Sequence, residues 1–164
     1  MGTRNLTKVI DKDNVTRVAQ YGQWDGYPSY TGTRILEFIK EHQILDKIEK
    51  SLPKVEFVSG EYVEQIYNKM TSDDDFSIAY PSLTRDTGCD ILRVLVYSNG
   101  PIPVVDSSDF EQDDLFCEGV YTINYYSRTF TSTYSGVTVS VDFDKIPSSE
   151  EYLKSFESLL TNAA

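Results

Sequence analysis

The stretch TFTSTYSGVTVSVDF, residues 129–143, decides the fold class of this chain. Its second half alternates apolar and polar side chains in the order Val137, Thr138, Val139, Ser140, Val141, Asp142 and Phe143. A period of two in a run rich in β-branched residues is typical of half-buried antiparallel strands. Ser135 and Gly136 are the expected turn or bulge points within this run.

More strands are expected on the N-terminal side of this stretch. Residues 116–126 place Tyr121, Ile123 and Tyr125 on one face of a predicted strand. At the start of the chain, residues 4–10 and 15–21 predict a hairpin around the turn-forming residues 11–14. A short strand is expected over residues 55–58.

Helical spacing of apolar residues predicts four helices, over residues 35–48, 60–70, 86–97 and 147–160. The second of these is expected to turn Tyr62 and Tyr67 inward, and Thr84 or Asp86 is expected to cap the third. The sequence therefore predicts a single α+β domain over residues 1–164. Its antiparallel sheet would combine the N-terminal hairpin with the C-terminal strands rich in Tyr, Val and Thr, and three to four helices would pack on it.

The chain is acidic, with 15 Lys and Arg against 26 Asp and Glu and a net charge of −11. This balance argues against direct binding of duplex nucleic acid and against anionic membrane surfaces. We find neither a run of about 20 apolar residues nor a signal peptide, so we expect a cytoplasmic protein that does not enter a membrane.

The residues for metal or thiol chemistry are few. Cys89 and Cys117 lie far apart and form no CxxC unit, and His42 is the single histidine. We expect two reduced thiols, no metal site and no cofactor. A Ser-His-Asp triad would have to use His42, because it is the single histidine.

The segment QYGQWDGYPS, residues 20–29, is the strongest candidate for a binding site, because aromatic rings and polar groups follow a predicted strand there. With the arginines near predicted loops, it gives the candidate ligand-binding residues Arg4, Tyr21, Gln23, Trp24, Asp25, Tyr27, Arg34 and Arg85. The alternative is a tight aromatic turn with Trp24 plugging the core, and arginines that are exposed or paired with Asp25 or Asp86.

Two further patterns carry acidic residues. Asp86-Thr-Gly88 matches the triplet of aspartic proteases, but a helical pattern follows it at once, which favours a helix start. The run from residue 106 to 118 holds the predicted acidic partner surface, formed by Asp106, Asp109, Glu111, Asp113 and Asp114. It lacks the central glycine of an EF-hand loop, so we expect it to be solvated or to face a basic partner.

Four segments together carry a resemblance: MGTRNLT (1–7), VAQYGQWDGYP (18–28), LTRDTG (83–88) and DLFCE (114–118). The chain is similar in them to a family of small uncharacterised proteins of bacteria, their phages and some fungi. It departs from the family pattern at Tyr30-Thr31, where Gly-Gln is common, and at Gly119, where Trp is common. The resemblance implies a prokaryotic or phage cytosolic setting and implies no reaction.

Two functions from different classes follow. The first is a non-catalytic binding protein, such as a phage or mobile-element inhibitor of a host defence system. It would act through the acidic surface on a basic host protein, or through an aromatic and arginine pocket that sequesters a nucleotide-like, anionic ligand. The alternative is a small hydrolase or transferase using Asp25, Asp86 or Glu118 with Arg4 or Arg85, which requires those carboxylates to share one cleft. A third possibility is that the 20–29 motif only holds the N-terminal hairpin on the first helix.

Overall fold

The computed structural model describes residues 2–70 and 72–163, without the side chains of residues 73–75, 162 and 163. Its centre is a five-stranded sheet in the order β2-β1-β5-β6-β7. These strands are β1 (Asn5–Ile10), β2 (Thr16–Gly22), β5 (Gly119–Asn124), β6 (Thr129–Tyr134) and β7 (Val137–Asp142). The α+β class and both hairpins are confirmed.

One pairing corrects the predicted antiparallel sheet. Strands β1 and β5 run parallel, whereas the other neighbours in this sheet are antiparallel, so the sheet is mixed. Parallel strands require a long crossover, and the chain between β2 and β5 supplies it through helices that return it to the same end of the sheet. As a result, the start of β1, the end of β2 and the start of β5 meet, with Asn5 paired to both Gly22 and Gly119.

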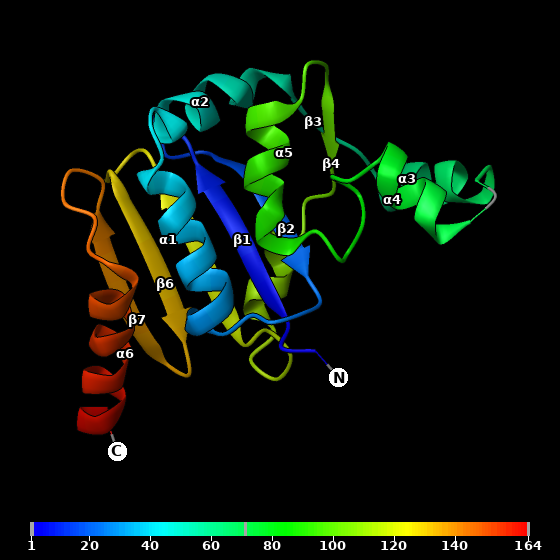
Figure 1. Cartoon of the computed structure of the whole chain (residues 1–164). Helices are drawn as coiled ribbons and strands as arrows, with labels where there is room; N and C mark the ends of the chain where they lie inside the picture. Colours follow the sequence, from blue (N-terminus) through cyan, green and yellow to red (C-terminus); the bar gives the residue numbers. More distant parts are fainter. Residues whose placement is uncertain (1, 71, 164) are drawn as a thin grey trace.

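Helices α1 (Thr33–Lys40), α2 (Ile44–Ser51), α5 (Ile91–Tyr97) and α6 (Ser149–Ala163) lie on one face of the sheet (Figure 1). The single helix predicted over 35–48 is wrong. It divides at residues 41–43, where Gln43 takes a left-handed backbone conformation with φ of 60°. The structure contains six α-helices over the described residues, where four were predicted. The break gives two helices in place of one, and α4 (Asp73–Ala79) was not predicted.

The core lies between the sheet and these helices, and three buried tyrosines anchor it. Tyr152 stacks on Phe130 at 6.1 Å between ring centroids, and its hydroxyl donates to Ser132 Oγ at 2.6 Å. Tyr121 donates to the carbonyl of Gly26, and Tyr125 donates to the carbonyl of Leu45. Each hydroxyl thus meets the requirement that buried polar groups be hydrogen-bonded, and burial raises the pKa of all three.

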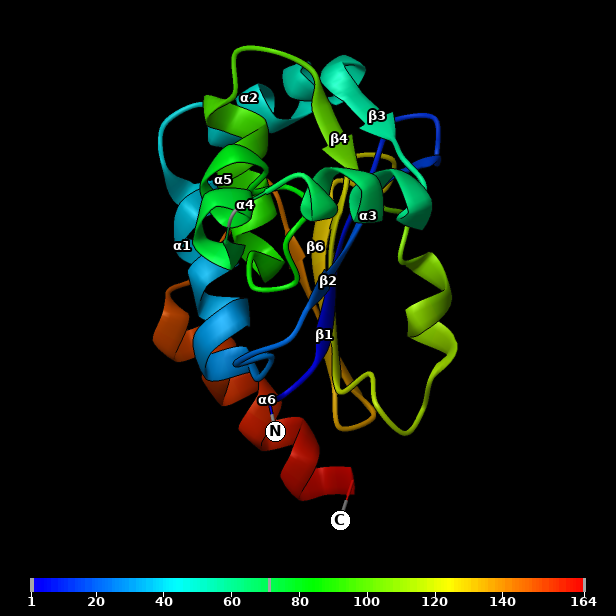
Figure 2. The same ribbon diagram turned by 90° about the vertical axis from the view of Figure 1, so that its right-hand side faces the viewer.

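The opposite face of the sheet is partly covered by the segment that leads into β5 (Figure 2). Its 3₁₀ turn, Ser108–Gln112, packs Phe110 edge-on against Tyr21 at 5.0 Å. Lys8 on β1 pairs with Glu111 at 2.8 Å. This cover lies over β1 and β2, whereas Thr138 and Ser140 on β7 remain exposed.

Helices α3 (Gly60–Asn68) and α4 project from the rest of the molecule beside a small parallel pair, β3 (Val55–Phe57) and β4 (Ile102–Val104) (Figure 1). The prediction that Tyr62 and Tyr67 face inward is wrong, since they are 44% and 45% exposed. The sheet face is already occupied by the other helices, so an apolar stripe on α3 has no sheet to cover. Within the described residues, none of the helices has the length and apolar character needed to cross a membrane.

Candidate functional site

The four segments that carry the resemblance lie together at one end of the sheet. The amide of Gly26 donates to the carbonyl of Thr3 at 2.9 Å, which ties the 20–29 motif to the N-terminus. The amide of Gln23 donates to the carbonyl of Arg85 at 3.1 Å, and that of Glu118 to the carbonyl of Arg4 at 3.0 Å. Segments far apart in sequence therefore build one backbone framework.

Asn5 lies at the centre of this framework and is 1% exposed. Its Nδ2 donates to the carbonyls of Thr3 and Trp24 at 3.2 and 3.1 Å, so both donors of the amide are used. Its Oδ1 has no hydrogen-bond partner among the described residues. A Cβ at Gly22 would lie 2.5 Å from this oxygen. Only glycine at position 22 therefore leaves room for the side-chain amide of Asn5.

A pocket of about 230 Å³ opens beside Asn5, between the end of β2 and the 3₁₀ turn Gly88–Asp90. We call it the Trp24 pocket. It is lined by Gly22, Gln23, Trp24, Asp25, Tyr30, Thr31, Arg34, Asp86, Thr87, Gly88, Cys89 and Asp90. The rings of Trp24 and Tyr30 are 50% and 46% exposed, so aromatic surface is available at its rim.

Two carboxylates of the pocket are each held by one aromatic donor. The indole Nε1 of Trp24 donates to Asp86 Oδ1 at 2.8 Å, and the hydroxyl of Tyr27 donates to Asp25 Oδ1 at 2.8 Å. The hydrogen bond to Asp25 and its charge raise the pKa of Tyr27. The second oxygen of each carboxylate has no hydrogen-bond partner in the part of the chain that the structure describes.

The third carboxylate of the pocket is committed to an arginine. Arg34 binds Asp90 with both ends of its guanidinium, at 2.7 Å from Nε to Oδ1 and 3.2 Å from Nη2 to Oδ2. The guanidinium carbon also lies 5.9 Å from the centre of the Tyr30 ring. The hydrogen bond to Asp90 raises the pKa of Arg34. Asp90 Oδ1 also accepts from Arg93 Nη1 at 3.2 Å. Asp25 and Asp86 then leave the pocket with excess negative charge.

The structure brings together four of the eight predicted ligand-binding residues, since Gln23, Trp24, Asp25 and Arg34 line the pocket. Tyr27 touches it through Asp25, and Tyr21 bonds to Gln23 while its ring packs on the far face of the sheet.

Two predicted arginines lie outside the pocket. The guanidinium of Arg4 lies 5.1 Å over the ring of Phe116, and Arg85 lines a neighbouring pocket together with Asp86.

Three structural expectations for this region are wrong. Trp24 is half exposed and does not plug the core. Arg34 pairs with Asp90, not with Asp25 or Asp86. Neither Thr84 nor Asp86 caps the predicted helix, because the helical turn starts after Thr87. The Asp86 carboxylate accepts from Trp24, and Thr84 Oγ1 accepts from the amide of Asp86.

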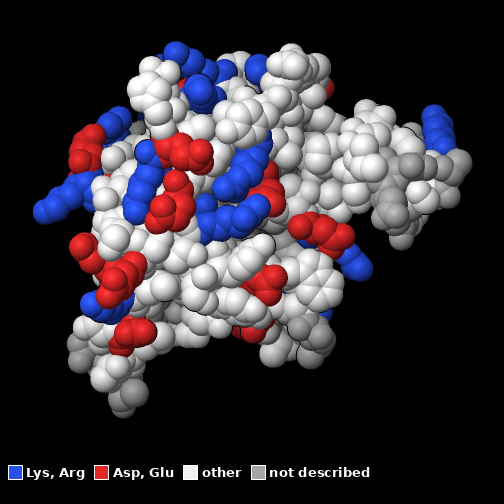
Figure 3. Space-filling view, viewed as in Figure 1, with Lys and Arg blue, Asp and Glu red and all other residues white. Residues whose placement is uncertain are grey.

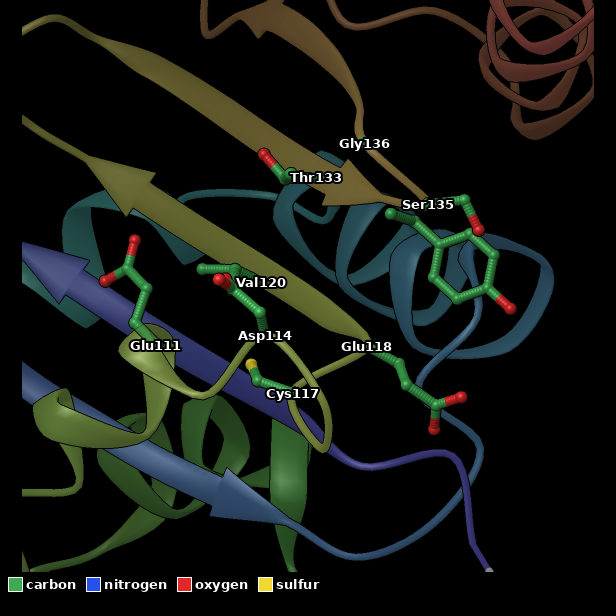
Figure 4. Close-up of a pocket in the computed structure, with 9 residues that line it drawn as sticks. Glu111, Asp114, Cys117, Glu118, Val120, Thr133, Ser135 and Gly136 are labelled. Atoms are coloured by element: carbon green, nitrogen blue, oxygen red, sulfur yellow. The ribbon is translucent and has the colours of Figure 1, made fainter. Parts of the chain in front are cut away.

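The carboxylates of the catalytic alternative do not all share one cleft. Asp25 and Asp86 line the Trp24 pocket. Glu118 lines a second pocket of about 490 Å³ with Glu111, Asp114 and Cys117. In Figure 4 the carboxylate of Glu118 points away from that of Glu111. A general base at Glu118 would therefore not act in the pocket that holds Asp25.

The predicted acidic surface is the segment 106–118, which we call the acidic segment. Two of its carboxylates accept hydrogen bonds from backbone amides within the segment. Asp106 accepts from the amide of Ser108, and Asp113 accepts from the amide of Phe116. Phe116 is 45% exposed and Leu115 is 78% exposed. No group of three or more His, Cys, Asp or Glu among the described residues is arranged to hold a metal ion. On the helix-covered face, by contrast, charges of both signs are mixed (Figure 3).

Sequence reasoning missed Asn5, Tyr30, Gly88 and Asp90 as parts of this site. Asp90 comes into reach of Arg34 only through the crossover, and the two residues are 56 positions apart. Gly88 was interpreted as part of a helix start, whereas its left-handed backbone, with φ of 49°, lets it pack on Gly22.

Both cysteines are free thiols, and we expect both to be unreactive in the folded protein. Burial raises the pKa of Cys89 to about 11, from an ordinary value of 9.0. Burial, with the charges of Glu111, Asp113 and Glu118, raises the pKa of Cys117 to about 11. Because the thiolate is the reactive form, alkylation at mildly alkaline pH should be about a hundredfold slower in the folded than in the unfolded chain. Mass spectrometry of the alkylated protein measures both rates, and equal rates would contradict the expectation.

Comparison with protein-family models, with curated proteins and with solved structures finds no match. The function is therefore argued from the geometry of this site.

Proposed function

We propose that the protein is a non-catalytic binding protein and that the Trp24 pocket is its ligand site. The observation that carries this proposal is the half-exposed ring of Trp24 beside two carboxylates that each keep one unbonded oxygen. Half-exposed aromatic rings next to fixed polar groups are what ligand pockets use for contact area and orientation. The backbone bonds from Gly26 and Gln23 hold this loop in place without a ligand.

The size of the pocket limits what it can hold. Pockets for drug-sized ligands span about 300–1,000 Å³, so the 230 Å³ of the Trp24 pocket suit one ring or one side chain. For the expected nucleotide-like ligand, the pocket supports the ring and offers no free guanidinium to the phosphate, because Arg34 is bound to Asp90. A base or another small planar group fits this arrangement better than a whole nucleotide.

The setting as an inhibitor of a host defence system is part of this proposal. It combines the phage or prokaryotic setting that the family resemblance implies with the small size and net charge of −11 of the chain. In it, the pocket would hold a planar group of a host molecule or host signal. The acidic segment is a second candidate surface for a basic host protein, favoured by the exposed Leu115 and Phe116 among its acids. Apolar side chains within a charged rim are typical of interface centres.

The emission of Trp24 tests the binding proposal, because this is the single tryptophan of the chain and it lies in the pocket. A panel of small planar compounds, neutral, cationic and anionic, is titrated against the full chain. We expect at least one compound to change the emission in a saturable way. Asp86→Asn should weaken its binding about tenfold or more, since one lost charge-assisted contact contributes about 1.4 kcal/mol or more.

Asp109→Asn is the matched control, because Asp109 lies on the acidic segment outside the pocket. It should leave the affinity unchanged. If no compound in any charge class changed the emission, or if both variants weakened binding equally, the Trp24 pocket would not be the ligand site. Turnover of a bound compound that is lost in Asp25→Asn would instead favour the hydrolase or transferase alternative.

A further inference from the structure

We infer that the group bound in the Trp24 pocket is a guanidinium, or an amidinium of the same planar shape. This inference rests on the proposed function and names the chemical class of its ligand. Its support comes from the unused carboxylate oxygens, the charge of the pocket, the arrangement of Arg34 with Asp90, and the volume of the pocket.

The charged groups that the pocket leaves unused are carboxylate oxygens. Asp25 and Asp86 each keep one carboxylate oxygen without a hydrogen-bond partner among the residues that the structure describes. Asn5 Oδ1 also lacks a partner among the described residues, but it is buried next to Gly22 and Gly88 and does not line the pocket. A Cβ at Gly22 would be 2.5 Å from this oxygen, and one at Gly88 would be 3.9 Å from it. Guanidinium is a donor-only group with five N–H bonds, so it matches the carboxylate oxygens that Asp25 and Asp86 present.

The charge of the pocket points the same way. Asp90 is shared by Arg34 and Arg93, whereas Asp25 and Asp86 have no ion-pair partner among the described residues. An anion would meet two uncompensated carboxylates, whereas a cation would be attracted to both of them. Removal of water by the bound group strengthens this preference, because charges interact more strongly at lower dielectric.

The pocket already contains one guanidinium in the proposed arrangement. Arg34 lies over the ring of Tyr30 at 5.9 Å and binds Asp90 through two hydrogen bonds. Trp24 and Asp86 form a second pair of an exposed ring and a carboxylate, and among the described residues no arginine forms an ion pair with this carboxylate or lies over this ring. Tryptophan is the aromatic residue that binds cations most strongly over its face. The ligand would supply the missing guanidinium.

The volume fits this group, since about 230 Å³ accommodates a guanidinium with a short alkyl stem. A free small molecule and an arginine side chain of a partner protein both carry this chemistry, and the experiment below separates these two sources.

The test titrates the full chain with L-arginine amide and follows the emission of Trp24. The matched probe is L-citrulline amide, which has the same shape and replaces the guanidinium with a neutral urea. We expect arginine amide to bind at least tenfold more tightly than citrulline amide, with an affinity that falls as salt rises. Asp86→Asn and Asp25→Asn should each weaken the binding of arginine amide, and Asp109→Asn should leave it unchanged.

A short peptide with one central arginine forms the second arm. Tighter binding of the peptide than of arginine amide assigns the guanidinium to a partner protein, and tighter binding of arginine amide assigns it to a small molecule. Both results support the inference. If adenosine or its monophosphate bound the pocket and arginine amide did not, the guanidinium inference would be overturned while the proposed function stood. If none of these probes nor any compound of the panel bound, the proposed function itself would fail.

Discussion

Gly26→Ala is expected to lower the free energy of unfolding by about 2–4 kcal/mol, because it overpacks a backbone contact and threatens two hydrogen bonds. A Cβ at this position would lie 2.6 Å from the carbonyl oxygen of Thr3 and 2.7 Å from Cβ of Asn5. A backbone oxygen and the Cβ of Asn5 occupy this space, and neither moves when a side chain rotates, so a change of rotamer cannot relieve the clash. The amide of Gly26 would lose its bond to Thr3, and its carbonyl would move away from the hydroxyl of Tyr121.

Gly60→Ala is the matched control, because a Cβ there meets nothing within 4 Å at the start of α3. It should change stability by a few tenths of a kcal/mol at most, in the stabilising direction, since alanine is the better helix former. Denaturant unfolding of both variants gives the comparison. If Gly26→Ala were as stable as Gly60→Ala, the contact between the N-terminus and the 20–29 motif would not be rigid. The backbone framework would then not hold the Trp24 pocket in shape.

The second large effect is a loss of stability at alkaline pH. Burial raises the pKa of Tyr121, Tyr125 and Tyr152 in the folded protein above the ordinary value of 10.0. Above about pH 10 these tyrosines release protons in the unfolded chain that they retain in the folded chain. The stability that they contribute is therefore fully present below that pH and falls as the pH rises. Each tyrosine contributes up to about 1.4 kcal/mol per pH unit, and the three together up to about 4.

Thermal unfolding across the alkaline range measures this slope. Tyr152→Phe should reduce it by about one proton, because it removes one of the three buried hydroxyls. Tyr126→Phe should leave it unchanged, because that ring is 64% exposed. An unfolding free energy that stayed flat to well above pH 10 would show that the buried hydroxyls are less desolvated than the structure indicates.

The sequence predicted those parts of the fold that local patterns determine. The alternation over 137–142 and the turn at Ser135-Gly136 reappear as the hairpin of β6 and β7. The parallel pairing of β1 with β5 could not be predicted, because it depends on where a crossover of nearly one hundred residues returns the chain. The break between α1 and α2 falls at Gln43, a residue type that gives no turn signal, although its backbone is left-handed there.

The same distinction applies to the site. The motif at 20–29 could be identified from its composition, because aromatic and acidic residues followed a predicted strand. The electrostatics of the pocket could not be predicted, because they depend on the partner of each charge. Arg34 was expected to be available for an anion, but Asp90 holds it with two hydrogen bonds. The role of Asn5 in the site depends on contacts with residues on three different segments, and a single sequence does not reveal such contacts.

The most direct test of the central claim is a map of backbone amide chemical shifts, recorded while the full chain is titrated with the tightest probe of the panel. We predict that the largest changes fall on residues 22–25 and 86–90, which line the Trp24 pocket. Smaller changes are expected at Asn5 and Arg34. Changes concentrated on the acidic segment or on residues 133–136, with residues 22–25 unaffected, would contradict the claim and place the binding site at the pocket of Figure 4.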